Sequence, residues 1–208
     1  MNSVSLKSAV AYVSRVMNEN RDYLVELDQQ NGDGDLGISM SDGFRAISDY
    51  LETAQETDLG KLFFQMSKMF NEAAPSSLGT ILSMGLMGMA QALKGKENAS
   101  LAETANAFHV GVTRIMEKAG SKPGEKTVLD ALCPAVEALQ TASATEDFKK
   151  AFEAAAQAAA SGSESTRQML PKHGRAAYYG EKSVGILDGG SVVGKLIFEA
   201  LFTYHSAQ

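Results

Sequence analysis

The sequence has little cysteine and no excess of positive charge. Cys133 is the single cysteine among 208 residues, so an internal disulfide is excluded. It follows Leu132 in an apolar helical stretch and is predicted to be a small buried side chain. The net charge of −6 comes without a basic cluster, which argues against nucleic acid as the main partner. Nucleotides remain open, because a divalent metal reverses the local sign of the charge.

Long apolar runs, strand patterns, repeats and linkers are also missing. No run approaches the length of a membrane span, and the first ten residues lack the basic and apolar regions of a signal peptide. These absences predict a cytoplasmic protein without a membrane partner. With 44% hydrophobic residues, the chain is expected to fold as a single globular domain over residues 1–208.

Helical periodicity is present almost throughout. Apolar residues recur at helical spacing in ten segments. The segment at 164–170 is short. The segment at 78–93 is nearly all apolar and is expected to be buried centrally. About eight helices joined by short loops predict an all-α, up-and-down antiparallel barrel or bundle. Such a fold would gather the unusual loops at one end. The helices are expected at 4–18, 21–30, 41–54, 59–74, 78–93, 101–119, 126–141, 146–161, 164–170 and 192–204, and the unusual loops at 28–39, 75–79, 120–127 and 174–190.

The most specific motif is DQQNGDGDLG at 28–37. It places Asp28, Asp33 and Asp35 within eight positions, where uncompensated carboxylates repel one another. A hard cation such as Mg²⁺ or Ca²⁺ resolves that repulsion, and the alternative is a solvated acidic turn. An EF-hand is disfavoured, because Leu36 stands where its loop needs glycine and Asp42 where it needs glutamate.

Two further segments have features of phosphate sites. PSSLGT at 75–80 opens a helix whose free N–H groups favour an anion, although an ordinary helix cap is the preferred interpretation of this segment alone. The GxxxxGK motif of a P-loop is absent. In KPGEKTVLD at 122–130, Lys126 and Thr127 are expected to begin a helix and to reach phosphates. The alternative there is a structural helix start in which Asp130 pairs with Lys126.

The fourth segment is HGRAAYYGEKSVGILDGG at 173–190. A long glycine-rich connection in a compact domain is often functional. The planar guanidinium of Arg175 suits phosphate, and Asp188 suits a nucleotide or a group beside a metal. His173 is expected at the surface, and His109 and His205 are expected to be structural.

Together, these segments resemble the nucleotide-binding L subunit of dihydroxyacetone kinase, over essentially the whole chain. The stretches that carry the resemblance are LDQQNGDGDLGISM at 27–40, PGEKTVLD at 123–130 and GRAAYYGEKSVG at 174–185. The resemblance implies an eight-helix antiparallel barrel with the nucleotide at one end. It implies that Asp28, Asp33 and Asp35 hold two Mg²⁺ ions against the phosphates of ADP or ATP.

The same resemblance implies the remaining site residues. Arg175 is the candidate catalytic group, and it belongs with Asp188 to the loop that covers the nucleotide. The other residues expected to bind the nucleotide are Leu36, Gly37, Ile38, Ser39, Ser77, Leu78, Gly79, Thr127 and Val128.

This chain departs from the family pattern on the phosphate and nucleotide side. Leu36 stands where the family commonly has histidine, and Ser39 where it has asparagine. The helix start reads PSSLG in place of GGASG, and the last segment reads GILDGG in place of GHxDPG. The metal ligands are therefore retained, while several donors are replaced by apolar or smaller groups.

The implied function is a phosphotransferase with an alcohol acceptor. The chain would be the nucleotide subunit of a dihydroxyacetone-type kinase, inactive alone, with the ketose held on a separate subunit. A phosphotransferase-system form is favoured, in which a phosphohistidine-carrying subunit rephosphorylates bound ADP. The alternatives are a kinase for another small ketose or polyol, a non-catalytic nucleotide-bound regulator that docks on a transcription factor or partner enzyme, and a purely structural bundle.

Overall fold

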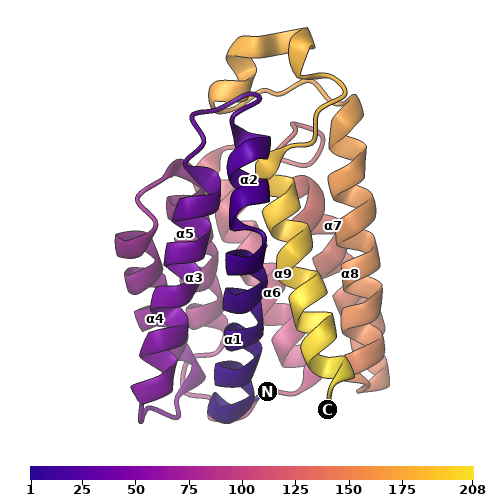
Figure 1. Ribbon diagram of the computed structural model, residues 1–208. Helices are drawn as coiled ribbons and strands as arrows, with labels where there is room; N and C mark the ends of the chain where they lie inside the picture. Colours follow the sequence, from indigo (N-terminus) through magenta and orange to yellow (C-terminus); the bar gives the residue numbers. More distant parts are fainter.

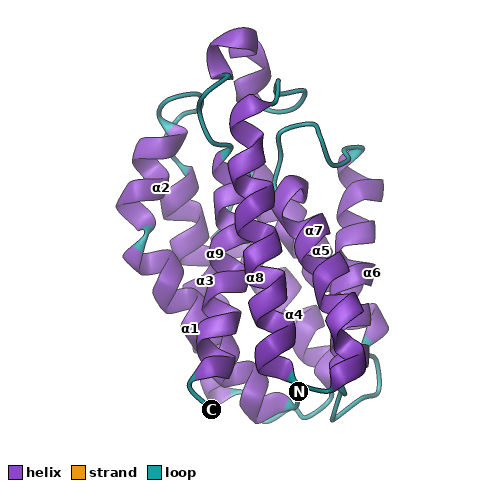
Figure 2. Cartoon of the chain, turned by 90° about the vertical axis from the view of Figure 1, so that its right-hand side faces the viewer, coloured by secondary structure: helices purple, strands orange, loops and turns teal.

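The computed structural model describes residues 1–208, apart from the side chain of Thr145. Over the described residues there are nine α-helices and no strand of a sheet, so the expected all-α class is confirmed (Figures 1 and 2). Short 3₁₀ segments lie at 143–145, 166–168 and 175–183. The helices are α1 (Ser3–Glu19), α2 (Arg21–Asp28), α3 (Leu36–Thr53), α4 (Leu59–Ala73), α5 (Ser77–Ala92), α6 (Leu101–Ala119), α7 (Leu129–Ala142), α8 (Phe148–Ser165) and α9 (Gly189–Ser206).

The helices form a closed ring of eight staves. Helices α1 and α2 follow each other across Asn20 and together make one stave. Each stave packs against its neighbour in sequence, and α9 closes the ring against α1. The chain alternates direction, with both termini at one end of the barrel (Figures 1 and 2). The predicted up-and-down antiparallel barrel is therefore confirmed.

Polar side chains begin most of the helices. Ser76 accepts the N–H of Gly79 at the start of α5, and Asp188 accepts that of Ser191 at the start of α9. Such caps satisfy N–H groups that have no partner within the helix. In α6, Ser100 and Glu103 form a reciprocal capping box, which sets the helix start without tertiary help.

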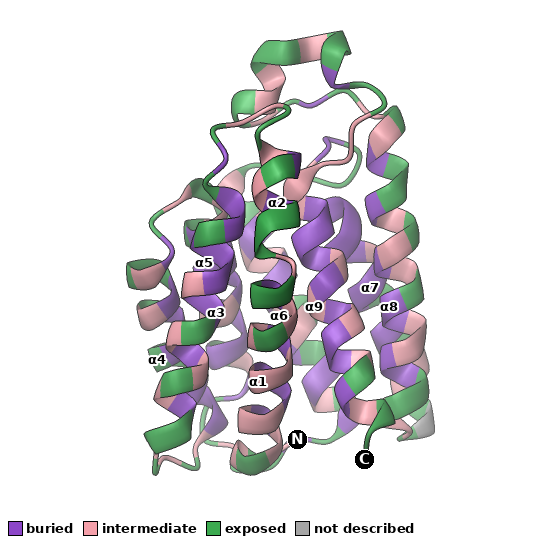
Figure 3. Cartoon of the chain, viewed as in Figure 1, coloured by how far each residue is buried: buried purple, intermediate pink, exposed green. Residues whose placement is uncertain are grey.

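Buried residues gather on the side of each helix that faces the barrel interior (Figure 3), and most of them are apolar. Phe70, Phe152 and Phe198 are among the largest fully buried side chains, and Cys133 is buried as predicted. An apolar cavity of about 330 Å³ remains inside the barrel, between residues such as Val10 and Phe152. In the described part of the chain, no helix combines the length and apolarity that a membrane span requires.

Four loops come together at the end opposite the termini, as the alternating topology requires. They are residues 29–35, 74–76, 120–128 and 166–188, and the last projects beyond the helices at the top of Figure 1. We call residues 169–187, which cross from the end of α8 to the start of α9, the rim segment. The predicted gathering of unusual loops at one end is confirmed.

Several predicted boundaries were wrong. Helix α3 begins at Leu36, so residues 36–39 are its first turn rather than a loop. Helix α7 begins at Leu129, which leaves Lys126 outside it with a left-handed φ of 59°. The short helix expected at 164–170 is the end of α8 followed by a 3₁₀ turn. The rim segment, expected to be irregular, contains 3₁₀ structure over Arg175–Ser183.

Candidate functional site

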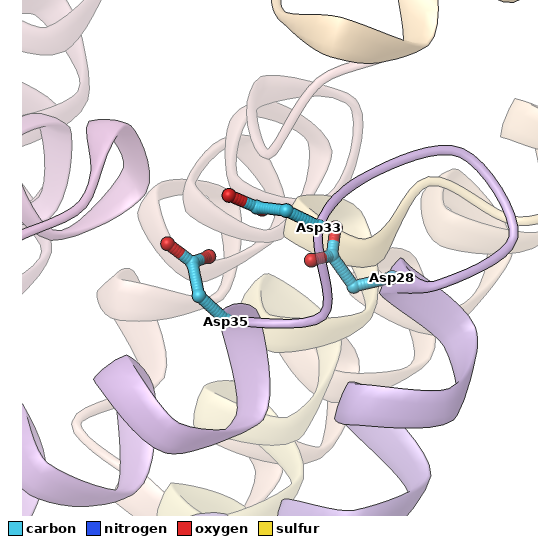
Figure 4. Close-up of side chains that lie close together, drawn as sticks. All are labelled: Asp28, Asp33 and Asp35. Carbon is cyan, nitrogen blue, oxygen red and sulfur yellow. The ribbon is translucent and has the colours of Figure 1, made fainter.

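Three aspartates lie together at the barrel end that gathers the loops. Asp28 ends α2, Asp33 lies in the connecting loop, and Asp35 directly precedes α3 (Figure 4). One carboxylate oxygen from each lies within 4.8 Å of the others. The Gly34 N–H donates to Asp28 Oδ2 at 2.8 Å, and a φ of 80° at Gly34 permits the turn that brings the residues together.

The charges of the cluster are only partly compensated. Burial raises the pKa of the Asp35 carboxyl above its usual value, and the charges of Asp33 and Asp28 raise it further. Arg175 from the rim segment acts in the opposite direction and forms an ion pair with Asp33. Three carboxylates facing one guanidinium leave a net negative site. Oxygen donors at this spacing fit a hard divalent cation such as Mg²⁺.

The aspartates open onto a cavity of about 360 Å³. Its wall is contributed by α2, α3 and α5, by loop 120–128 and by the rim segment. The structure therefore brings together residues from all four sequence segments singled out above. The predicted site residues that line the cavity are Asp28, Asp33, Asp35, Leu36, Ser77, Leu78, Thr127, Val128, Arg175 and Asp188.

Four predicted residues do not line the cavity, namely Gly37, Ile38, Ser39 and Gly79. A Cβ at Gly37 would overlap the Arg21 carbonyl oxygen, so this glycine serves the close packing of α3 on α2. Ile38 points to solvent and is 43% exposed. The prediction for residues 36–39 followed from the family resemblance, which places a loop near the phosphates there, whereas in the structure a helical turn directs only Leu36 of these four into the cavity.

Ser39 and Gly79 lie behind the residues that line the cavity. Ser39 is buried and accepts a hydrogen bond from Ser76 Oγ at 3.2 Å, which joins the start of α5 to α3. The Gly79 N–H is taken by Ser76 Oγ at 3.1 Å. By helix geometry, the N–H groups of Ser77 and Leu78 have no partner inside α5, and these two residues border the cavity. The start of α5 thus offers an anion-binding position next to the aspartates.

Loop 120–128 is arranged differently from the prediction. Asp130 does not pair with Lys126, because its carboxylate accepts the N–H groups of Gly124 at 2.5 Å and Thr127 at 2.7 Å. The Lys126 side chain is 3% exposed, and its ammonium is directed to backbone carbonyls of the rim region. Thr127 and Val128 face the cavity, while the Lys126 ammonium is already engaged with carbonyl oxygens.

Asp188 stands where the rim segment enters α9. Its backbone N–H donates to Thr166 Oγ1 at 3.0 Å, and its carboxylate caps the helix through the Ser191 N–H at 2.6 Å. Burial raises the pKa of this carboxyl to about 7, and the charges of Asp130 and Asp28 act in the same direction. The Ser191 N–H and the Lys126 ammonium oppose the increase.

Sequence reasoning missed the contribution of Glu125 and underrated that of His173. Glu125 is 8% exposed, and its carboxylate contacts His173 Nε2 at 2.7 Å and Lys172 Nζ at 3.3 Å. These contacts hold the pKa of the Glu125 carboxyl at about 2, with the His173 hydrogen bond as the largest cause. His173 lines the cavity, and the only sequence signal was its place at the start of a glycine-rich segment.

The class of this protein is an eight-stave helical barrel that carries a carboxylate cluster and a helix start on one rim. The chain belongs to the DAK2 domain family, whose pattern matches residues 30–203. It is 28% identical to the ADP-binding subunit DhaL of the PEP-dependent dihydroxyacetone kinase of Escherichia coli, over 91% of this chain and 92% of the relative. It is 29% identical to L-erythrulose kinase of Pectobacterium atrosepticum, over 94% of this chain and 35% of the relative.

The fold is also similar to that of a solved kinase. The dihydroxyacetone kinase of C. freundii, solved in complex with AMP-PNP and Mg²⁺, matches 98% of this chain with a TM-score of 0.77 and 24% identity. This chain spans about a third of the length of that kinase, with 34% covered. At this identity the likeness establishes the shared fold.

Proposed function

We propose that this chain is the nucleotide-binding subunit of a dihydroxyacetone-type kinase. It would bind ADP or ATP together with Mg²⁺ at the rim cavity and take part in phosphoryl transfer to a small ketose. The observation that carries the proposal is the meeting of three carboxylates, a helix start and an arginine around one cavity. The family membership and the E. coli ADP-binding subunit, matched along 92% of its length, support it.

Asp28, Asp33 and Asp35 would hold the metal, as two ions in our proposal. Bound Mg²⁺ supplies neutralisation of the charge on the nucleotide phosphates. The N–H groups of Ser77 and Leu78 would orient a phosphate by backbone hydrogen bonds. Arg175, which pairs with Asp33 here, would turn its guanidinium to the phosphate and stabilise the charge of the transferring group.

The acceptor and the phosphate source follow from the same proposal. The ketose would be held on a separate subunit that docks at the rim, and no group of this chain is assigned as the base that deprotonates it. The PEP-dependence of the E. coli relative supports a phosphotransferase-system-linked form. A phosphohistidine-carrying subunit would then rephosphorylate ADP that stays bound, and the complex would be cytoplasmic.

The direct test is whether the protein holds a nucleotide. Purified protein is denatured and the supernatant is analysed for released ADP or ATP, and ADP is then titrated calorimetrically with and without Mg²⁺. We expect Mg²⁺-dependent binding that is lost in Asp33→Ala. Asp49→Ala, at an exposed position further along α3, is the matched control and should bind normally. Absence of both bound nucleotide and Mg²⁺-dependent ADP binding in the parent protein would refute the proposal.

A second candidate is a kinase subunit for another small ketose, such as a four-carbon one. The similarity to an L-erythrulose kinase favours it, as do Leu36 and Leu78, which stand in place of the usual family residues and both line the cavity. An assay of three- and four-carbon ketoses with the cognate ketose-binding subunit distinguishes the two. Strong preference for dihydroxyacetone would remove this candidate, and binding of ADP without any transfer would point to a nucleotide-bound regulator.

A further inference from the structure

Two adjacent residues of loop 120–128 hold the rim segment to the barrel, in addition to the hydrogen bonds between Arg167 and Gly185. Lys126 is almost fully buried, and its ammonium donates to the carbonyl oxygens of Ser183 at 2.7 Å, Ile186 at 2.8 Å and Met169 at 3.4 Å. An ammonium has three N–H donors, so these carbonyls use all of them. The carbonyls come from both ends of the rim segment, 43 to 60 residues away in sequence.

Glu125 supplies the second attachment. Its carboxylate binds His173 and Lys172, and its carbonyl oxygen accepts the Lys172 N–H at 3.2 Å. Attachments at 169, 172–173, 183 and 186 leave residues 174–182 as an arch between fixed ends. Arg175 lies on this arch and reaches across the cavity to Asp33.

The conformation of Lys126 indicates that the attachment is built into the fold. A left-handed φ of 59° is unfavourable for a residue with a Cβ, and it is maintained here at a buried position. A lysine ammonium is also costly to bury, so its three carbonyl partners are required. The unfavourable backbone conformation and the buried charge thus occur at the same residue, which anchors the segment that carries Arg175.

We propose that Lys126 is a positioning residue for the nucleotide site, because its buried ammonium fastens the rim segment so that Arg175 stays opposite the aspartates. This inference rests on the proposed function, and it adds a positioning element to the same site. Lys126 borders the cavity, but the three N–H donors of its ammonium are engaged by carbonyl oxygens, so it is assigned no contact with nucleotide or metal. It acts by limiting the positions that the arch, and with it the guanidinium, can adopt.

The absence of tryptophan provides a direct probe of the arch. Tyr178 is 92% exposed and does not line the cavity, so Tyr178→Trp places a single fluorophore on the arch with little disturbance. Lys126→Met, which keeps the length of the side chain and removes its donors, is introduced into this parent. Lys122→Met, at an exposed position of the same loop, is the matched control.

We expect Lys126→Met to lower the fluorescence anisotropy of Trp at position 178 and to weaken Mg²⁺–ADP binding by at least about fivefold. Lys122→Met should change neither. In an Arg175→Ala background, most of the effect of Lys126→Met on ADP affinity should disappear, since the lysine acts through the arginine. A purely structural role would leave the two effects independent.

Three results would contradict the positioning role of Lys126. Unchanged anisotropy, unchanged affinity or fully additive effects would each overturn the inference. If Lys126→Met does not fold, Glu125→Gln weakens the second attachment by removing its charge and should produce the same changes to a smaller degree, and unchanged anisotropy and affinity there overturn the inference. If the parent protein itself does not bind Mg²⁺–ADP, the proposed function fails, whereas the anisotropy still decides whether Lys126 fastens the arch.

Discussion

At the scale of single residues, Asp188 combines a capping role with an unusual protonation state. Its pKa of about 7 lies above the ordinary 3.8, chiefly because of burial. The folded protein therefore keeps a proton that the unfolded chain releases between about pH 4 and about pH 7. Stability from this group is fully present at low pH and is lost as the pH rises through the folded pKa.

Asp188→Asn should remove this pH dependence, because asparagine also caps a helix but carries no charge. In the parent, the free energy of unfolding should fall between about pH 4 and about pH 7, at no more than about 1.4 kcal/mol per pH unit from one group, and this group should add no further slope above the folded pKa. Urea denaturation at several pH values in EDTA measures the slope. Asp49→Asn should retain it, and parallel profiles for parent and Asp188→Asn would assign the proton elsewhere.

Gly34 provides a second prediction at this scale. With φ at 80° and the Gln29 Cγ only 2.9 Å from the position of a Cβ, Gly34→Ala should cost about 1 kcal/mol and displace the N–H that holds Asp28. Metal affinity should therefore fall with stability. Gly120→Ala, with a φ of 61° and open space around it, should lose stability alone. Calorimetric titration of Mg²⁺ with ADP, beside urea denaturation, separates the two effects.

At the scale of elements, α7 and α8 approach closely near the site. A Cβ at Gly162 of α8 would overlap the carbonyl oxygen of Asp130 in α7. Gly162→Ala should therefore destabilise the protein by about 1–3 kcal/mol through overpacking. Gly194→Ala in α9, which would meet the Ala131 methyl at 3.1 Å, should cost clearly less. Thermal and urea unfolding compare them, and equal stabilities would contradict the helix spacing described here.

Some helix boundaries can be predicted from local sequence patterns alone, and others cannot. The capping box of Ser100 and Glu103 starts α6 where periodicity places it, since both partners are local. The start of α3 at Leu36 was missed because its N-cap, Asp35, makes no side-chain cap and its first turn lacks an acidic residue. Glycines in that stretch were read as a loop, while Gly37 is required by the contact of α3 with α2.

At the scale of the whole molecule, a ligand bound at the rim should stabilise the complete barrel. A ligand at about one hundred times its Kd adds about 2.7 kcal/mol to the free energy of unfolding. For a chain of 208 residues, this corresponds to a rise in Tm of about 5 to 10 °C. We expect that rise with ADP and Mg²⁺ together, and no rise when EDTA replaces Mg²⁺ or in Asp33→Ala. A rise that persists in EDTA would place the nucleotide at a site independent of the aspartates.

The sequence by itself determined the helical class, the order of the helices and the carboxylates that we propose as metal ligands. Apolar stripes and acidic clusters are local properties, so Asp28, Asp33 and Asp35 were identified without a structure. Only the tertiary structure decided that α9 closes on α1, that Arg175 faces Asp33, and that Lys126 binds carbonyls up to 60 residues away. These contacts depend on how the ring closes, and ring closure is a property of all eight staves together.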